Sequence, residues 1–400
     1  MQTPNPRSAY IHVPFCNRRC GYCNFTLLTG RDDLVPKYLD ALQAELASVV
    51  GSPQEVDTIF LGGGTPSYLR GAEMQRLQEL IAYWFPLADA GEYSCEVNPV
   101  DCQPDQLEAL AAGGVTRVSI GGQSFDDAKL SVLQRDHSSQ QLSDSINACS
   151  EVFGDVSLDL IFAAPDETLQ QWQSDVAIAL QHPITHLSTY CLTVERGSAF
   201  FGRVARNELQ EVDEDTQLAM YSHVRMALSH AGWEHYEVSN FSLPGHRCRH
   251  NETYWIGSPW WAVGPGAASY LPQRTSSTAP PFAGGNEQPH WPTMLRRVNH
   301  RSTTTYIRRI LDGKSAVHET EVVEPLEQLR ERLVFGLRRL EGVDILQLNE
   351  WWGSDVLPHF QPAIQRFVDQ NLLKWNGQRL SLTSDGLVIS DSLWPALFGH

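Results

Sequence analysis

The chain has 400 residues, of which 42% are hydrophobic and 19% charged, and its formal net charge is −17. This composition is ordinary for a folded globular protein and excludes a mostly disordered chain, a collagen or a coiled coil. The acidic balance disfavours non-specific binding to nucleic acid or to anionic membranes. The sequence shows neither a signal peptide nor an apolar run of the roughly 20 residues that cross a bilayer. We therefore expect a cytoplasmic protein with no transmembrane segment, and leave peripheral membrane association open.

Short β-rich runs alternate with helical stretches between residues 8 and 240. The expected strands are Ser8–Val13, Val56–Leu61, Glu92–Val97, Val115–Ile120, Val156–Phe162 and His186–Leu192, with Trp233–Val238 as an optional further strand. The expected helices include Val35–Val49, Ala72–Trp84, Pro104–Ala112, Leu169–Ala179 and Asp213–His230. Strands separated by helices form parallel βαβ units. The pattern predicts an α/β fold with a partial or full parallel β/α barrel, whose site lies at the carboxyl ends of the strands.

The character of the sequence changes near residue 245. We expect residues 1–245 to form the barrel, 246–300 a connecting segment that contains a Pro/Ser-rich loop at 271–293, and 301–400 a smaller, mainly helical domain. In that domain we expect helices at Glu327–Leu340 and Leu357–Gln370 and a hairpin at Leu373–Leu382 that turns at Asn376 and Gly377. Helices with a small hairpin predict a winged-helix-like shape.

Cysteine is the one unusual residue type. Three of the eight, Cys16, Cys20 and Cys23, have the spacing C-x3-C-x2-C directly after the first strand. A chain without signs of export has no need of four disulfides, and a zinc site wants a fourth ligand that no residue at a normal spacing supplies. Three thiolates can instead hold three irons of a 4Fe–4S cluster and leave the fourth iron open. A zinc knuckle or three unrelated buried thiols is the alternative.

Two arginines and one histidine accompany this cysteine run. Arg18 and Arg19 lie within it and would lower the pKa values of the thiols. His12 precedes it but alternates with apolar neighbours inside the first strand, so we expect a core role.

Polar and glycine-rich residues mark the ends of the next strands. Gly62–Pro66 (G-G-G-T-P) follows the second strand, where glycines permit close approach to the backbone. Glu96 and Asn98 lie two apart after the third strand and share a face. One face of the fourth strand carries Arg117, Ser119, Gly121 and Gln123. For Glu96 a surface acid is the alternative, and for Arg135 a solvated helix-end arginine.

The cysteine spacing after a barrel's first strand resembles the radical S-adenosylmethionine (SAM) superfamily. The resemblance implies that Cys16, Cys20 and Cys23 hold a 4Fe–4S cluster whose open iron binds SAM. In that superfamily an electron from the cluster cleaves SAM to a 5′-deoxyadenosyl radical. By residue-level matching, the resemblance also implies SAM contacts from Tyr10, Tyr22, Gly64, Thr65, Glu96, Gln123, Arg135 and Asp159.

A narrower resemblance, to the HemN/HemW branch, rests on several further segments. They are Ile11–Cys16, Gly63–Pro66, Arg117–Phe125, Asp159–Ile161 and Tyr236–Phe241. That branch holds two activities. Its oxygen-independent coproporphyrinogen III oxidases carry a further cysteine two residues after the third, where this chain has Phe25. Its HemW-type haem chaperones carry Phe at that place, together with an H-N-x-x-Y-W motif, here His250–Trp255.

These two markers together imply a haem chaperone that binds haem and delivers it to acceptor haemoproteins, such as those of respiration. They also imply an electron donor for the cluster, and leave open whether SAM is turned over. The alternative function is the coproporphyrinogen III oxidase, a radical SAM enzyme of porphyrin biosynthesis. Phe25 argues against it.

The H-N-x-x-Y-W motif is open to two interpretations. His250 offers an imidazole, a usual axial ligand of haem, and Tyr254 and Trp255 offer flat apolar surface for a porphyrin. The motif could instead pack the chain against the barrel, and Cys248 is a rival ligand. Relatives often have a G-x-G-A-H turn, but Ala268 stands here at the histidine position.

A third hypothesis is a DNA-binding regulator that uses the C-terminal domain. A basic patch could form from Arg297, Arg301, Arg308 and Arg309. Because the net charge of −17 counts against it, we expect no nucleic-acid partner.

Overall fold

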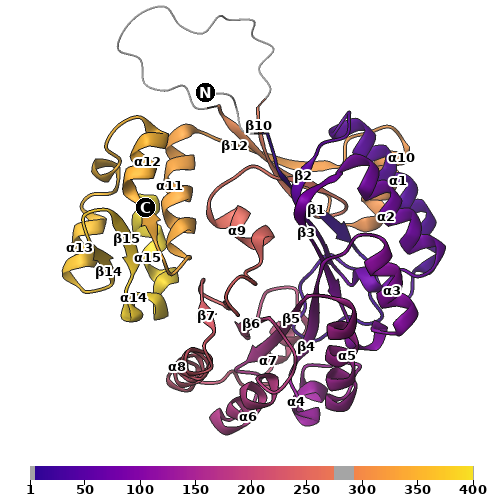
Figure 1. The fold of residues 1–400 in the computed structure, drawn as a ribbon, viewed down its shortest axis with the longest axis horizontal. Helices are drawn as coiled ribbons and strands as arrows, with labels where there is room; N and C mark the ends of the chain where they lie inside the picture. Colours follow the sequence, from indigo (N-terminus) through magenta and orange to yellow (C-terminus); the bar gives the residue numbers. More distant parts are fainter. Residues whose placement is uncertain (1–4, 274–291, 400) are drawn as a thin grey trace, which may run out of the picture.

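A computed structural model describes residues 5–273 and 292–399. Its largest sheet has nine strands in the order β7-β8-β6-β5-β4-β3-β2-β1-β9 (Figure 1). Neighbours from β1 to β6 all pair in parallel. These strands are β1 (Ser8–Val13), β2 (Val56–Gly63), β3 (Leu87–Val97), β4 (Arg117–Gln123), β5 (Asp155–Phe162) and β6 (His186–Cys191). The α/β class predicted from the alternating pattern is confirmed.

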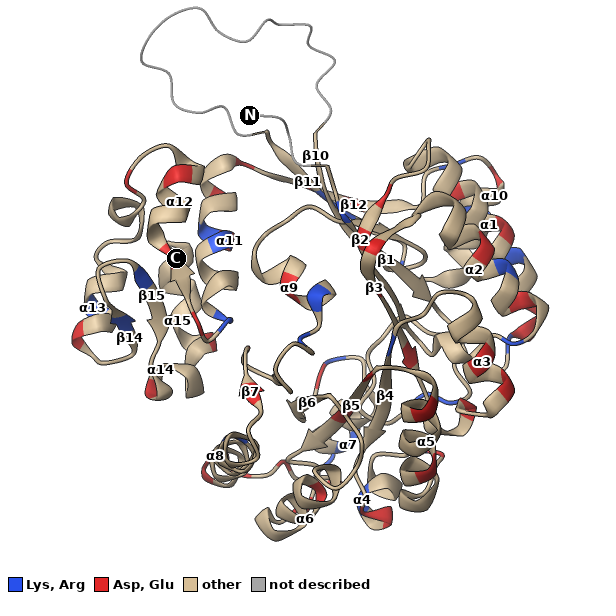
Figure 2. Cartoon of the chain, in the orientation of Figure 1, with Lys and Arg blue, Asp and Glu red and all other residues tan. Residues whose placement is uncertain are grey.

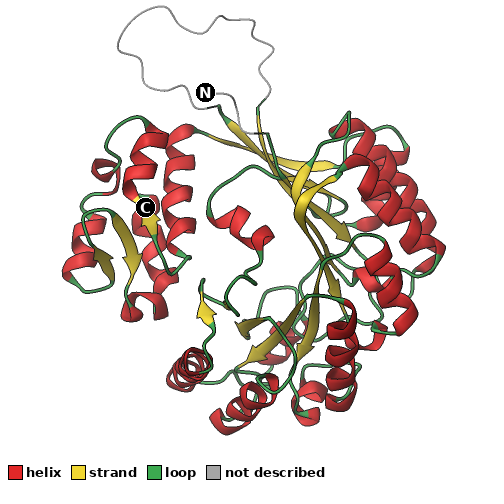
Figure 3. Ribbon diagram, in the orientation of Figure 1, coloured by secondary structure: helices red, strands yellow, loops and turns green. Residues whose placement is uncertain are grey.

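Helices cover the outer face of this curved sheet (Figure 3). They are α1 (Val35–Val49), α2 (Ala72–Trp84), α3 (Pro104–Ala112), α4 (Asp127–Val132), α5 (Ser139–Val152), α6 (Leu169–Ala179) and α8 (Glu214–His230). The short helix α7 (Ala199–Ala205) instead meets the loop after β1, where the N–H of Phe200 donates to the carbonyl oxygen of Gly21. Capping boxes fix the starts of α5 and α6, because Ser138 with Gln141 and Thr168 with Gln171 satisfy the first backbone N–H groups. The apolar faces of the helices and the strands between them form one continuous core.

The barrel is partial rather than full. The parallel series ends at β6, because its next neighbour β8 (Asn240–Ser242) runs antiparallel to it. The optional strand expected at Trp233–Val238 is reduced to β7 (Glu234–His235), which pairs antiparallel with β8. At the other edge, β9 (Trp261–Val263) pairs in parallel with β1. Between these elements lies the short helix α9 (Arg249–Trp255), inside the curve of the sheet in Figure 1.

A second, three-stranded sheet was not expected from the sequence. It contains β10 (Ala268–Pro272), β11 (Met294–Asn299) and β12 (Val317–Val323) in antiparallel order. The helix α10 (Thr303–Leu311) between β11 and β12 packs on α1. The expected Pro/Ser-rich loop at 271–293 falls for its greater part, residues 274–291, outside the described residues.

The C-terminal unit has its own core, with buried residues from Leu329 to Leu397. Since Tyr306 and Ile310 of α10 belong to the first core, we propose a boundary near residue 323, where β12 ends, in place of 301. Its elements are α11 (Pro325–Leu337), β13 (Val343–Asp344), α12 (Ile345–Trp352), α13 (Ala363–Asp369), β14 (Leu373–Trp375), β15 (Arg379–Leu382), α14 (Ser384–Val388) and α15 (Ser390–Phe398).

Two local expectations within this unit can be compared with the structure. The hairpin turns at Asn376 and Gly377, where Asn376 Oδ1 accepts from two backbone N–H groups and Gly377 has φ +92°. The single helix expected over Leu357–Gln370 is wrong at its start. It is a short 3-10 turn at Leu357–Phe360 followed by α13, because Pro362 cannot continue a helix.

Charged positions are spread over the molecule. Figure 2 shows acidic residues on most outer helices rather than on one face. The four arginines of the supposed basic patch lie on β11, on α10 and between them, outside the second core. Within the described residues, no helix is both long enough and apolar enough to pass through a membrane.

Candidate functional site

The loop after β1 brings the three clustered thiols to the carboxyl end of the sheet. Cys16 and Cys20 are buried, Cys23 is partly exposed, and none is in a disulfide. All three line one cavity of about 130 Å³, here called the cysteine cavity. No three His, Cys, Asp or Glu side chains in the described part of the chain converge closely enough to hold a single metal ion. Thiols spread around a cavity suit a multi-iron cluster, in which each thiolate takes its own iron.

Side chains from two other connecting segments reach two of these thiols. The hydroxyl of Thr65 lies 3.1 Å from Sγ of Cys16, and Nη1 of Arg135 donates to Sγ of Cys20 at 3.3 Å. Such donors stabilise the thiolate, which is the form that binds iron. The cavity therefore fits the group that the cysteine spacing implies.

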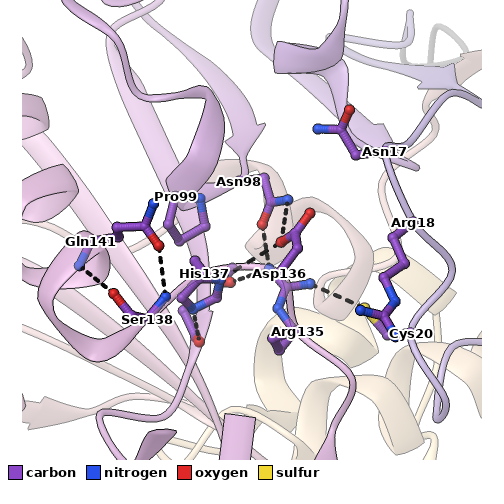
Figure 4. A network of polar contacts seen from close by, with 12 residues as sticks. Asn17, Arg18, Cys20, Asn98, Pro99, Arg135, Asp136, His137, Ser138 and Gln141 are labelled. Carbon is purple, nitrogen blue, oxygen red and sulfur yellow. Dashed lines mark hydrogen bonds and ion pairs between the residues drawn. The ribbon is translucent and has the colours of Figure 1, made fainter. Parts of the chain in front are cut away.

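The third thiol is served by the loop itself. The backbone N–H of Phe25 donates to Sγ of Cys23 at 3.5 Å. Burial raises the pKa of Cys23, while this N–H and the charge of Arg19 act in the opposite direction. Arg18 also lines the cysteine cavity, and Figure 4 shows its side chain beside Cys20.

Arg135, between α4 and α5, connects the loop to two strands. Its Nη2 donates to the carbonyl oxygen of Gly121 at 2.6 Å and to Oδ1 of Asn98. Figure 4 shows Asn98, Asp136 and Cys20 around this guanidinium. Arg135 is thus held by partners on several segments and is not the solvated helix-end arginine that the sequence also allowed.

Seven of the eight residues matched to SAM contacts line the cysteine cavity. They are Tyr22, Gly64, Thr65, Glu96, Gln123, Arg135 and Asp159. They come from the cysteine loop, the ends of β2 to β5 and the α4–α5 connection. Residues far apart in sequence meet because the carboxyl ends of parallel strands share one edge of the sheet.

Two carboxyl groups in this cavity have unusual pKa values. Burial raises the pKa of Glu96 to about 7, although its Oε2 accepts the N–H of Gly63 at 2.9 Å. Burial also raises the pKa of Asp159 to about 6, although Ser119 donates to both its oxygens at 3.1 and 3.2 Å. Both groups can therefore gain or lose a proton near neutral pH, which is common at functional sites.

The glycine-rich turn closes against the cysteine loop. The N–H of Gly64 donates to the carbonyl oxygen of Val13 at 2.8 Å, and that of Thr65 to Phe15 at 2.7 Å. A Cβ on Gly64 would lie 2.5 Å from the carbonyl oxygen of Phe15, so the approach requires glycine. Because these N–H groups already have acceptors within the chain, they are not free to bind a ligand.

Tyr10 lies apart from the other seven. It lines a neighbouring polar cavity of about 230 Å³, which shares Glu96 and Asp159 with the cysteine cavity. This polar cavity also includes His186, Ser188 and Tyr190 of β6, which the sequence analysis did not single out. Their spacing of two along one strand places them on one face, and this was the available signal.

His250 of the H-N-x-x-Y-W motif lies at the inner wall of the polar cavity and is only 1% exposed. Thr58 donates its hydroxyl hydrogen to Ser8, so its oxygen accepts from Nδ1 of His250 at 2.9 Å. Nε2 then accepts the hydroxyl of Tyr254 at 2.8 Å. Burial lowers the pKa of His250 to about 3, so the ring is neutral.

The rest of the motif also serves packing. The backbone N–H of His250 donates to Oε1 of Glu92 on β3 at 3.0 Å. The helix α9 contacts β2, β3 and α11 and so joins the barrel to the C-terminal unit. Cys248, the rival ligand, is buried, and burial raises its pKa to about 12. The geometry of His250 and Cys248 favours packing over ligation.

Comparisons with known proteins agree with this geometry. A model of the radical SAM superfamily matches residues 10–177, and one of the HemN C-terminal domain matches residues 323–389. The heme chaperone HemW of Lactococcus lactis is 31% identical over 392 residues, which cover 97% of this chain and 96% of the relative. The chain belongs to the HemW family of the radical SAM superfamily.

Further members and one solved structure extend this assignment. The heme chaperone HemW of Mycobacterium tuberculosis is 33% identical over 401 residues, covering 98% of this HemW-family chain and 95% of the relative. The structure of coproporphyrinogen III oxidase HemN from Escherichia coli matches with a TM-score of 0.81. That match covers 98% of this chain and 90% of HemN at 19% identity, and therefore shows a shared fold alone.

Proposed function

We propose that this HemW-family chain binds a 4Fe–4S cluster through Cys16, Cys20 and Cys23, binds SAM beside it, and carries haem to acceptor haemoproteins. The proposal that the chain binds the cluster and SAM is supported by the cysteine cavity, which is lined by three free thiols and by polar residues of four strands. The haem part is supported by relatives named heme chaperones that match over nearly the whole chain.

Within this proposal, some residues around the cavity hold the cluster and others bind SAM. The cluster, when bound, supplies an open iron that the amino and carboxylate groups of SAM can ligate. Arg135 and Thr65 hold two thiolates in place through the contacts described above. The carboxylates of Glu96 and Asp159 face the same space and can accept hydrogen bonds from ribose hydroxyls.

His250 has a positioning role in this proposal. Both its ring nitrogens are engaged, so it holds Tyr254 at the cavity wall instead of offering a ligand to iron. Haem is the cargo of the protein and must be released, which a weakly ligated iron favours.

We also propose the setting in which this happens. An external electron donor reduces the cluster, the acceptors include respiratory haemoproteins, and the protein works in the cytoplasm without a nucleic-acid partner. The spread of acidic residues over the outer helices supports the last point.

Haem titration of the anaerobically reconstituted protein tests the function. We expect saturable haem binding followed by transfer to an apo-haemoprotein. Protein that keeps its cluster but neither binds nor transfers haem would contradict the proposal.

The oxidase is the second candidate, because the whole chain shares its fold with HemN. An anaerobic assay for vinyl products formed from coproporphyrinogen III distinguishes the two. We expect no turnover, and robust turnover would favour the oxidase.

A further inference from the structure

A third cavity opens beside the cysteine cavity and has a different character. It has a volume of about 420 Å³, within the range of roughly 300–1,000 Å³ typical of small-molecule sites. Here called the open cleft, it is lined in part by Tyr10, Phe25, Tyr254, Trp260, Ala268 and Arg301. Phe25 is 64% exposed, the highest value among the large apolar side chains of the described residues.

The aromatic wall of the open cleft is held firmly. The rings of Tyr254 and Trp260 meet edge to face with centroids 4.8 Å apart. Nε1 of Trp260 donates to the carbonyl oxygen of Ala268 at 2.7 Å. Fixed aromatic surfaces of this kind bind flat apolar ligands with little loss of side-chain entropy.

The turn Gly264–Ala268, which adjoins this wall through the Trp260–Ala268 hydrogen bond, is anchored by a buried carboxylate. Buried Glu45 of α1 accepts the N–H of Gly264 at 2.8 Å and the amide of Asn299 at 2.6 Å. Gly264 has φ +100°, and a Cβ there would lie 2.5 Å from the carbonyl oxygen of His12. The shape of the cleft is therefore built into the fold.

Two arginines place positive charge at the cleft and in the cavity beside it. Arg301 lines both the open cleft and an adjoining cavity of about 310 Å³, which Arg19 also lines. Arg301 donates to Thr26 and to the carbonyl oxygen of Asn24, and Arg19 to carbonyl oxygens of the same loop. Among the ion pairs of the described residues, neither arginine has a carboxylate partner, although the chain has a net charge of −17.

Flat aromatic walls and two unpaired guanidinium groups at one edge match a flat ligand with carboxylates along one side. We propose that the open cleft is the haem site, with the porphyrin against Phe25 and Trp260 and its propionates on Arg301 and Arg19. This inference rests on the proposed haem-carrier function and locates its site.

The open cleft holds haem without a histidine ligand. Among the described residues, His12 is the one imidazole that lines the cleft. It is fully engaged, because Nε2 donates to the carbonyl oxygen of Thr26 at 2.7 Å and Nδ1 accepts from Tyr10 at 3.0 Å. His250 lies behind Tyr254 with both nitrogens bonded. Stacking and carboxylate pairing suit a carrier that must hand its haem to another protein.

Anaerobic haem titration of the reconstituted full chain tests the site, with Arg301→Glu compared to Arg308→Glu. Arg308 is exposed on α10, does not line the cleft and gives the same charge change. We expect Arg301→Glu to weaken haem binding about tenfold or more, as loss of a charge-assisted hydrogen bond does. Arg308→Glu should bind like the parent chain.

A second arm keeps the test independent of loop damage. Protoporphyrin dimethyl ester lacks the carboxylates, so it should bind the parent chain more weakly than free-acid protoporphyrin does. Arg301→Glu should reduce this preference for the free acid. Ala268→Phe, which fills the cleft, should weaken both ligands while the iron content of the cluster stays the same.

The outcomes separate the two proposals. A parent chain that binds no haem overturns the carrier function and the cleft together. If the parent chain binds haem and Arg301→Glu and Ala268→Phe bind it equally well, the cleft alone is overturned. The cleft would also be overturned if the haem absorption spectrum showed a histidine ligand in the parent chain and none in His250→Ala.

Discussion

The cysteine cavity and the α9 motif were both marked by short sequence motifs, yet the structure treats them differently. At the cysteine cavity the marked side chains converge on one space from several strand ends. At α9 the marked histidine turns inward and is enclosed by Thr58, Tyr254 and Glu92. A motif at the end of a parallel strand thus faces the site, whereas a motif on a connecting helix can serve the core. Four substitutions can break or sharpen this contrast.

The largest effect is expected at the cysteine loop. Cys20→Ala should abolish the cluster, because it removes one of three ligands and the thiolate that Arg135 contacts. Iron and sulfide content after anaerobic reconstitution measures this loss. Cys191→Ala is the matched control, since Cys191 is a free, partly exposed thiol that does not line the cavity. Equal iron content in the two variants would refute the ligand assignment.

At α9 we expect a loss of stability rather than of a ligand. His250→Ala leaves the hydroxyl of Tyr254 without its acceptor and empties a buried site, so the free energy of unfolding should fall by about 2–4 kcal/mol. The absorption spectrum of bound haem should not change. Chemical denaturation and haem spectra of the same preparation measure both. A stable variant with an altered haem spectrum would show that His250 is a ligand after all.

The pH dependence of SAM binding should report Glu96. Its pKa is raised to about 7, so lowering the pH from about 8 to about 6 protonates the carboxylate and removes a hydrogen-bond acceptor. SAM affinity should therefore fall about tenfold over this range, because the fraction of molecules with a charged Glu96 carboxylate falls by about the same factor. Glu96→Gln should bind more weakly at the higher pH and lose the step centred near pH 7, so that only the titration of Asp159 near pH 6 remains.

Asp159→Asn is the companion variant. It removes a neighbouring charge that helps to raise the pKa of Glu96, so the Glu96 step should persist but move to lower pH. A pH profile that stays unchanged in Glu96→Gln would rule out Glu96 as the titrating contact.

The smallest effect on the fold is expected at Phe25. Its side chain is 64% exposed, and its contact to Cys23 uses the backbone N–H. Phe25→Ala should therefore change the free energy of unfolding by no more than about 0.5 kcal/mol and leave the iron content intact. Haem binding alone should weaken. A loss of the cluster in this variant would show that the side chain shapes the loop.

The sequence predicted the parallel order of the barrel and most of the cysteine cavity because both follow from strand alternation and from residues at strand ends. Glu96 and Gln123 were found in this way. The sheet β10–β11–β12 was missed, because its pairing joins strands separated by the long 273–293 segment. The enclosure of His250 was undecided, since it depends on Thr58 and Glu92, which are far away in sequence.

The central claim is that the three thiols and the strand ends form one site for the cluster and SAM. Electron paramagnetic resonance tests it most directly, on the reduced, reconstituted chain with and without SAM. We predict the signal of one cluster that changes on addition of SAM, and the absence of both signal and change in Cys20→Ala. A cluster signal that does not respond to SAM would contradict the assignment of the cysteine cavity.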